Sequence, residues 1–318
     1  MILTVTPNPS LDRTYGVPAL TRGRVLRADG ERVDPGGKGV NVSRAVAAAG
    51  VRTTAVLPLG GAPGVLLAEL LGAQGVDVTA VSIAGQTRSN IALAEPDGTL
   101  TEINSPGPEL SREESALLLD TVRSCAADVA WIACCGSLPR GLGPGWYAEL
   151  VHRAHAAGAR IALDASGPEL PAVPAARPDV IKLDADRLAA AVGRPLPTLG
   201  DAVKAAEELR TLGAGAVLVS LGRDGRLLVS AEGAHHGTAP APAVRSGVGA
   251  DDASLAGFLI AGGAGPEALA SALASALAHG AAAARLPGSA MPTPADLRPE
   301  QVRITQDPPL DLPLDDGF

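Results

Sequence analysis

A glycine-rich segment with two adjacent aspartates is the strongest candidate for chemistry in this sequence. Asp251 and Asp252 follow Gly247 and Gly249 and precede an apolar helical pattern. Backbone N–H groups at such a helix entrance can stabilise the negative charge of a phosphoryl group during transfer. A carboxylate in the first turn of that helix can take a proton from an attacking hydroxyl, so Asp252 is a candidate general base. The alternative interpretation is structural, because aspartate is also a favoured helix N-cap residue.

A second glycine-rich segment lies near the N-terminus, in Asp34-Pro35-Gly36-Gly37-Lys38-Gly39-Val40-Asn41-Val42-Ser43, and runs into a helical pattern. Glycines let backbone N–H groups approach a ligand, and the start of a helix favours negative charge. The spacing is not that of a nucleotide-binding P-loop, because no Ser or Thr follows Lys38. The pattern predicts a site for an anion or a polyol, with Lys38 and Asn41 as ligands. An ordinary tight turn is the alternative.

Two further sets of candidates follow predicted strands. Gly222 and Gly225 would line a nucleotide site or form a simple turn, and Ser137 follows another strand. The carboxyl end of a strand is where ligands bind in open α/β sheets. These residues are therefore expected near the same site.

The elements that must position these residues alternate between strand and helix. Apolar runs predict strands at 2–6, 54–59, 129–134, 160–164, 180–182 and 216–220, and other patterns predict helices at 39–49, 63–71, 112–124, 145–157, 201–212, 252–261 and 266–284. Continuous apolar runs are typical of parallel strands buried on both faces. The order predicts an α/β sandwich with a mostly parallel central sheet.

Two segments interrupt the alternation and predict a lid over the strand ends. Residues 11–33 are polar and irregular, and within 86–105 two strand-like stretches flank Pro96-Asp97-Gly98, a strong hairpin signal. Arg88, Asn90 and Asn104 fall on this hairpin, where the arginine would fork onto a phosphate or lie solvated at the surface. Residues 1–305 are expected to form one domain, and the Pro- and Asp-rich tail 306–318 is expected to be loosely held.

Composition excludes several classes of function. The 318 residues carry a net charge of −8 with no basic run, which argues against a nucleic-acid partner. The chain shows no secretory signal and no apolar run long enough to span a membrane, so a cytoplasmic protein is expected. Its three cysteines, Cys125, Cys134 and Cys135, lack metal-type spacing and are expected to be reduced, buried thiols.

The order and spacing of these motifs together resemble the ribokinase-like (PfkB) carbohydrate kinases, in particular the 1-phosphofructokinase and tagatose-6-phosphate kinase branch. The resemblance extends from Thr6-Pro7-Asn8-Pro9 to about residue 288, and its most specific string is Glu102-Ile103-Asn104-Ser105-Pro106-Gly107-Pro108. It implies a three-layer α/β/α sandwich with a small β-strand lid. It also implies transfer from ATP, with Mg²⁺, to a sugar phosphate, and a homodimer formed through the lid.

The resemblance implies a role for each matching residue. Asp252 would be the catalytic base. Substrate would be bound by Asp12, Gly37, Lys38, Asn41, Arg88, Asn90, Asn104 and Ser137, of which Lys38, Arg88 and Ser137 would meet the phosphate already on the sugar. The nucleotide would lie along Lys182, Asp184, Ser220, Gly222, Gly225, Gly249, Ala250, Asp251 and Gly280.

Three departures from the family pattern fall on the nucleotide side. The pattern Lys-Pro-Asn-x-x-Glu reads here Lys182-Leu183-Asp184-Ala185-Asp186-Arg187, so Asp184 replaces the asparagine and Arg187 replaces the glutamate that helps to order Mg²⁺. In the family's Gly-Ala-Gly-Asp the second glycine is Asp251. Two like charges about 4 Å apart repel by roughly 1 kcal/mol in water and about 4 kcal/mol at an effective dielectric near 20.

These departures keep several interpretations open. Asp251 is expected to weaken ATP binding or transfer unless a cation intervenes, and Asp184, Asp186 or Asp251 would recruit Mg²⁺ differently. The acceptor is expected to be fructose 1-phosphate. The alternatives are tagatose 6-phosphate or a related hexose phosphate, and a protein that binds a sugar phosphate without transferring to it.

Overall fold

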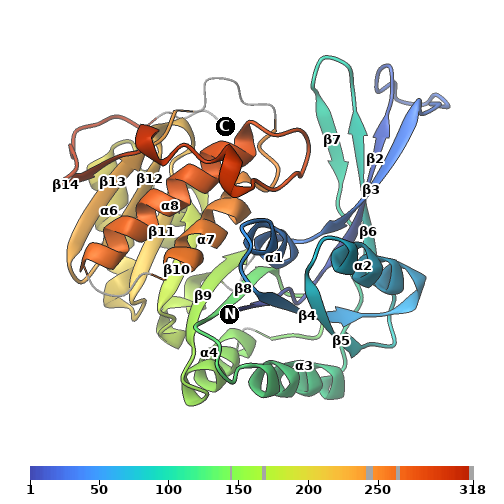
Figure 1. Ribbon diagram of the computed structural model, residues 1–318, viewed down its shortest axis with the longest axis horizontal. Helices are drawn as coiled ribbons and strands as arrows, with labels where there is room; N and C mark the ends of the chain where they lie inside the picture. The colour runs from blue at the N-terminus through green and yellow to red at the C-terminus, as the bar shows by residue number, and fades with distance from the viewer. Residues whose placement is uncertain (144, 167–169, 241–245, 263–265, 315–318) are drawn as a thin grey trace.

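A ten-stranded, mostly parallel sheet forms the centre of the molecule (Figure 1). The computed structural model describes all residues except 144, 167–169, 241–245, 263–265 and 315–318. Across the sheet the order is β14 (Arg303–Gln306), β13 (Gly233–Thr238), β12 (Arg226–Ser230), β11 (Ala216–Ser220), β10 (Val180–Asp184), β9 (Arg160–Ser166), β8 (Trp131–Ser137), β1 (Ile2–Val5), β4 (Thr53–Leu59) and β5 (Asp77–Ser82). The strands from β5 to β11 are mutually parallel, as the apolar runs predicted.

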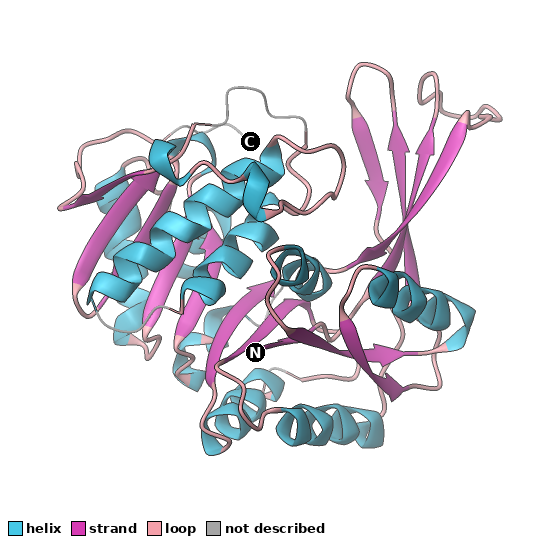
Figure 2. Ribbon diagram, viewed as in Figure 1, coloured by secondary structure: helices cyan, strands magenta, loops and turns pink. Residues whose placement is uncertain are grey.

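Helices cover both faces of this sheet and complete three layers (Figure 2). One face carries α1 (Lys38–Ala48), α2 (Gly61–Ala73), α7 (Ala250–Ala261) and α8 (Pro266–Ala284), and the other carries α3 (Arg112–Cys125), α4 (Trp146–Ala156), α5 (Ala185–Val192) and α6 (Leu199–Thr211). Short 3₁₀ helices lie at Leu170–Ala172, Pro174–Ala176, Gly222–Asp224, Pro294–Asp296 and Pro299–Gln301. Successive strand residues alternate between the two cores, so that buried Cys134 faces α3 and α4 whereas buried Cys135 faces α1 and α7. The predicted α/β/α sandwich is confirmed.

An antiparallel extension of the sheet was not predicted. Strands β12, β13 and β14 pair antiparallel beyond β11. The chain after β14 then returns to α6, where Leu199 N and Gly200 N donate to Leu312 O and Leu310 O. The tail is therefore hydrogen-bonded to the start of α6 as far as Leu312, and residues 315–318 lie outside the described residues.

The lid is a separate four-stranded sheet that stands on the carboxyl edge of the large one (Figure 1). Its order is β3 (Gly30–Gly36), β2 (Ser10–Gly16), β6 (Arg88–Ala94) and β7 (Leu100–Ile103). The hairpin predicted at Asp97-Gly98 joins β6 to β7. Residues 11–33, expected to be irregular, instead contribute β2 and most of β3, which pair in register along their length. Among the described residues, no helix is long and apolar enough to cross a membrane.

Candidate active site

The candidate residues meet at the carboxyl ends of the parallel strands. Lys182 and Ser220 lie on adjacent strands β10 and β11, and both reach Asp251 at the start of α7. Asn41 in the first turns of α1 reaches Asp252, the next residue of α7. Two helices and two strands that are distant in sequence thus converge at one edge of the sheet, which is the usual place for an α/β active site.

Asp252 is a buried carboxylate with a strongly perturbed protonation equilibrium. The N-cap of α7 is Gly249, with φ 75°, and no side chain caps the helix, so the N-cap interpretation of Asp252 does not apply. Its side chain accepts a hydrogen bond from Asn41 Nδ2 at 2.9 Å. Burial raises the pKa of Asp252 to about 6; nearby Asp164 adds to this, and Lys182 and the Asn41 hydrogen bond oppose it. Such a carboxyl is well matched to proton transfer near neutral pH.

Asp164 of β9 organises the cations beside Asp252. Its buried carboxylate lies 3.0 Å from Lys38 Nζ, 3.2 Å from Lys182 Nζ and 2.6 Å from Arg187 Nη1. Burial alone would raise the pKa of Asp164, but these three cations outweigh it and hold the pKa well below its usual range. No role was predicted for Asp164, although its carboxylate pairs with both Lys38 and Lys182.

Asp251 does not present a bare charge to the start of α7. Its Oδ2 accepts from Lys182 Nζ at 2.8 Å, and its Oδ1 accepts from Ser220 Oγ at 2.7 Å and from Arg226 Nη1 at 3.0 Å. Burial would raise the pKa of Asp251, but Lys182 and Arg226 hold it well below its usual range. Two cations thus neutralise the carboxylate that the sequence predicted to be repulsive.

Arg226 is a residue of this site that the sequence did not reveal. It is the first residue of β12, is only 8% exposed, and donates to both Ser220 Oγ and Asp251 Oδ1. A Cβ added at Gly280 of α8 would lie 2.7 Å from Arg226 Nη2, so this glycine leaves room for the guanidinium. The only signal was the expectation that a cation would have to oppose the charge of Asp251.

The other expected nucleotide glycines have local explanations. Gly222 opens a short 3₁₀ helix with φ 57°, and Gly225 has φ 92°. A Cβ at Gly225 would lie 2.1 Å from Gly237 O of β13. Gly225 is therefore required by the packing of the β12–β13 hairpin, and Ala250 is simply the first residue of α7.

The carboxylates near the nucleotide side do not fit a protein-held magnesium ion. Asp184 accepts from Arg187 N at 2.8 Å and from Arg187 Nε at 2.7 Å, and Asp251 is paired as described. Within the described part of the chain, no cluster of three His, Cys, Asp or Glu side chains could hold a metal. No step is therefore assigned to a metal bound by these residues.

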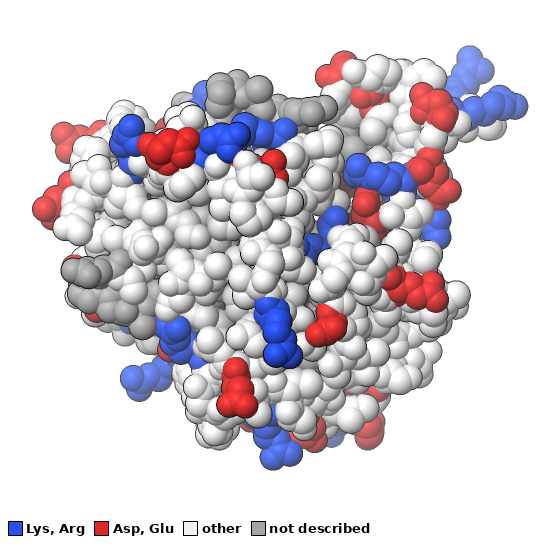
Figure 3. Space-filling view, viewed as in Figure 1, with Lys and Arg blue, Asp and Glu red and all other residues white. Residues whose placement is uncertain are grey.

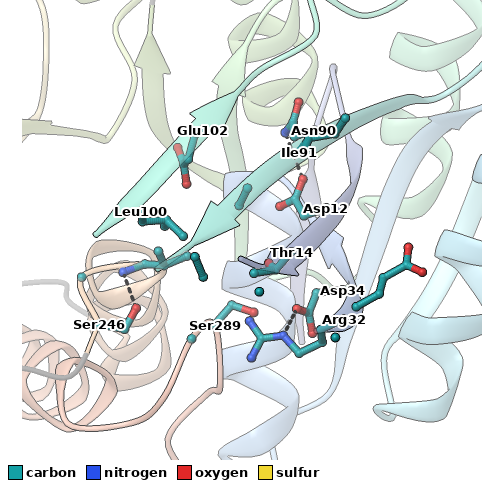
Figure 4. Close-up of a pocket in the computed structure, with 18 of the residues that line it drawn as sticks. Asp12, Thr14, Arg32, Asp34, Asn90, Ile91, Leu100, Glu102, Ser246 and Ser289 are labelled. Atoms are coloured by element: carbon teal, nitrogen blue, oxygen red, sulfur yellow. Dashed lines mark hydrogen bonds and ion pairs between the residues drawn. The ribbon is translucent and has the colours of Figure 1, made fainter. Parts of the chain in front are cut away.

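On the lid side, a cavity of about 740 Å³ lies between the inner face of the lid and the loops 246–248 and 288–289 (Figure 4). Asp12, Asn90 and Asn104 line it. Asp12 Oδ1 accepts from Asn90 Nδ2 at 2.9 Å and from Ser10 Oγ at 2.7 Å, and burial raises the pKa of Asp12. A carboxylate and two amides on one wall are suited to the hydroxyls of a sugar.

The residues expected to meet the sugar's phosphate do not line this cavity. Lys38 is paired with Asp164. Arg88 donates to Asn8 O at 2.9 Å and to Ser105 O at 2.7 Å. Its guanidinium therefore links the segment before β2 to the segment after β7, at the base of the lid. Ser137 ends β8, and Gly37, with φ 111°, is the N-cap of α1. The structure thus brings together Asn41, Asp252, Asp251, Lys182 and Ser220, but it places Lys38, Arg88 and Ser137 outside the lining of the cavity.

Comparisons with known proteins agree with this geometry. The sequence pattern of the pfkB family carbohydrate kinases matches residues 8–296. The 1-phosphofructokinase of Rhodobacter capsulatus is 38% identical over 260 residues, which cover 81% of this chain and 82% of that protein. The ATP-dependent 6-phosphofructokinase isozyme 2 of Mycobacterium tuberculosis H37Rv is 34% identical over 261 residues, covering 81% and 77%.

Solved structures give the same result for the fold. Phosphofructokinase-2 from Escherichia coli, in complex with potassium, matches 93% of this chain and 96% of its own with a TM-score of 0.86 and 31% identity. The ribokinase of Arabidopsis thaliana matches 92% and 96% with a TM-score of 0.73 at 24% identity, which shows the shared fold alone. This chain therefore belongs to the pfkB family of carbohydrate kinases, and it is a phosphofructokinase-type sugar kinase of ribokinase-like fold, a phosphotransferase with a hydroxyl acceptor.

Proposed function

We propose that this protein transfers a phosphoryl group from ATP to the free primary hydroxyl of fructose 1-phosphate, giving fructose 1,6-bisphosphate and ADP. The observation that carries the proposal is the buried Asp252 beside Asn41, at the start of α7 and facing the converging strand ends. The relatives named 1-phosphofructokinase support the choice of acceptor.

In the proposed reaction Asp252 takes the proton of the acceptor hydroxyl. The acceptor oxygen then forms a bond to the γ-phosphorus while the bond from that phosphorus to the β-phosphate oxygen breaks, and the electron pair leaves with ADP. Backbone N–H groups at the start of α7, together with Lys182 and Arg226, which contact Asp251 in the first turn of this helix, would stabilise negative charge on the transferring group. Mg²⁺ is predicted to arrive with the nucleotide's phosphates, since Asp184 is already paired with Arg187.

An ADP-release assay with a panel of acceptors tests the proposal. The panel contains fructose 1-phosphate, fructose 6-phosphate, tagatose 6-phosphate and unphosphorylated fructose, each with ATP and varied Mg²⁺. Fructose 1-phosphate should give the highest kcat/KM. A higher value for tagatose 6-phosphate or another hexose phosphate would replace the proposed acceptor with that one.

A second candidate function is sugar-phosphate binding without transfer. The observation that favours it is that Lys182 and Arg226 are both engaged by Asp251, so that the protein's own carboxylate occupies cations which a nucleotide would need. Titration calorimetry with fructose 1-phosphate, alone and with Mg-ATP, separates the two functions. Tight binding of the sugar phosphate with no heat from Mg-ATP would favour the non-transferring protein.

We also propose a cytoplasmic homodimer that forms through the lid. Ile91 of β6 and Ile103 of β7 are directly opposite each other and are 37% and 57% exposed. Paired exposed isoleucines on a small sheet are typical of a surface that a partner covers. Light scattering of the Ile103→Lys variant tests this, because a dimer through this surface should dissociate, whereas an unchanged mass would exclude the lid as the interface.

A further inference from the structure

The inner face of the lid presents two parallel rows of side chains to the cavity. Register pairs place Asp34, Asp12 and Asn90 side by side in the first row, across β3, β2 and β6. The second row runs from Arg32 through Thr14 and Ala92 to Glu102. Because these residues are two positions further along their strands, the second row lies about 7 Å from the first. A sugar bound at the first row would carry its terminal substituent towards the second.

The charges of this cavity are unevenly distributed. Among the described residues that line it, the acidic ones are Asp12, Glu31, Asp34 and Glu102, and the single cationic one is Arg32. The space-filling view shows charged side chains of both signs where the lid meets the body (Figure 3). A phosphate group would be repelled by most of this wall and attracted at one place, the guanidinium of Arg32.

Arg32 is oriented so that part of its guanidinium is available. Its Nε donates to Asp34 Oδ2 at 2.6 Å, and its side chain is 51% exposed. The terminal nitrogens lie over Gly288, where an added Cβ would be 2.4 Å from Nη2. Neither terminal nitrogen has a protein acceptor among the described residues. Two free N–H-bearing nitrogens on one planar group form the fork that binds phosphate oxygens.

The nearby basic residues are less available. Arg88 uses both terminal nitrogens on the carbonyls of Asn8 and Ser105, and Lys38 lies against Asp164. Neither lines the cavity. The close-up shows Arg32 beside Asp34 and near Ser289, at the junction between lid and body (Figure 4).

We propose that Arg32 is the phosphate-binding residue of this cavity, contacting a phosphate group through its two terminal nitrogens while Asp34 holds its Nε. This inference rests on the proposed function, in which both substrates carry phosphate. The phosphate is either the one on the acceptor sugar or the one at the end of the donor. Both sources present phosphate oxygens to the Arg32 guanidinium, and the experiment below distinguishes the two.

The test compares Arg32→Ala and Arg32→Lys with a matched control, Arg13→Ala. Arg13 lies on β2 of the same lid and also pairs with a carboxylate, Glu31 at 2.7 Å, but it does not line the cavity. Calorimetry measures the Kd for fructose 1-phosphate and for unphosphorylated fructose, and steady-state kinetics measure KM for ATP. Loss of a charge-assisted bond to phosphate should raise Kd on the order of 10- to 100-fold.

The expected result is that Arg32→Ala weakens fructose 1-phosphate binding by this factor while fructose binding is unchanged, with Arg32→Lys intermediate and Arg13→Ala like the wild type. If instead only KM for ATP rises, the residue binds the donor's phosphate, and the inference also holds. Equal effects on fructose and fructose 1-phosphate, or Arg32→Ala indistinguishable from Arg13→Ala in every measurement, would overturn it. A wild type that binds fructose 1-phosphate without turnover refutes the proposed kinase but not the role of Arg32.

Discussion

Replacing Asp252 by Asn should lower turnover by orders of magnitude and at the same time stabilise the protein at neutral and alkaline pH. The variant keeps the size of the side chain and an oxygen for Asn41 Nδ2, but it cannot accept the hydroxyl proton. Loss of a general base of this kind lowers kcat by roughly 10²- to 10⁴-fold. The free energy of unfolding should rise, because burial of the ionised Asp252 carboxylate costs free energy in the folded wild type.

The size of this stabilisation follows from the pKa. On folding, burial moves the pKa of Asp252 from 3.8 to about 6. Since the folded pKa is the higher one, this group favours the folded state below pH 3.8, and that contribution is lost as pH rises through about 6. Linkage gives a cost of about 0.5 kcal/mol at pH 4 and about 3 kcal/mol at pH 8. The asparagine has no such cost at either pH.

Urea denaturation of both proteins at the two pH values is the assay. The gain in free energy of unfolding for Asp252→Asn should be larger at pH 8 than at pH 4 by about 2.5 kcal/mol. Asp251→Asn is the control, because Lys182 and Arg226 hold the pKa of Asp251 low and its removal should destabilise the fold at neutral pH. A gain for Asp252→Asn that does not change with pH, or a variant with wild-type turnover, would refute the reasoning.

Three further predictions concern the same charged cluster. The pH profile of kcat/KM should have an acidic limb near pH 6, and Asn41→Ala should move it upward because a hydrogen bond that favours the ionised Asp252 is lost; a wild-type limb below about pH 5 would contradict the base assignment. Lys182→Met should lower the free energy of unfolding by about 3–5 kcal/mol in urea, since two carboxylates lose their buried partner; a loss under about 1 kcal/mol would show that they find another. Asp184→Asn should leave the Mg²⁺ concentration for half-maximal turnover unchanged, because Arg187 already occupies this carboxylate, whereas a marked increase would assign it to the metal.

The parallel half of the fold was predictable because its strands are buried on both faces. Strands such as β11 are continuous apolar runs. Because both faces of such a strand are buried, its sequence does not alternate between polar and apolar residues. The antiparallel extension has a different composition. Strand β13 has the sequence Gly-Ala-His-His-Gly-Thr, yet its His235 and His236 side chains are buried. Only tertiary packing makes such a polar segment a strand, so local pattern could not reveal it.

The sequence motifs pointed to residues that the structure brings together, but not to the charged partners of these residues. The motif order identified Asp252, Asn41 and Asp251, but not what surrounds them. Asp251 lies 69 residues from Lys182 and 25 from Arg226. Since a single sequence carries no information about which distant charges meet, the repulsion expected from Asp251 was predicted without the two cations that oppose it.

The pairing of β2 with β6 determines how the lid can move. These strands come from two separate excursions of the chain, yet they pair in parallel over their whole length, from Ser10 opposite Arg88 to Gly16 opposite Ala94. The guanidinium of Arg88 joins the two excursions at their base through Asn8 and Ser105. Any movement of this sheet would therefore carry β2 and β6 together, because moving them separately would break their shared hydrogen bonds. Such a movement would keep the spacing of the two rows on the inner face and change only their distance from Asp252.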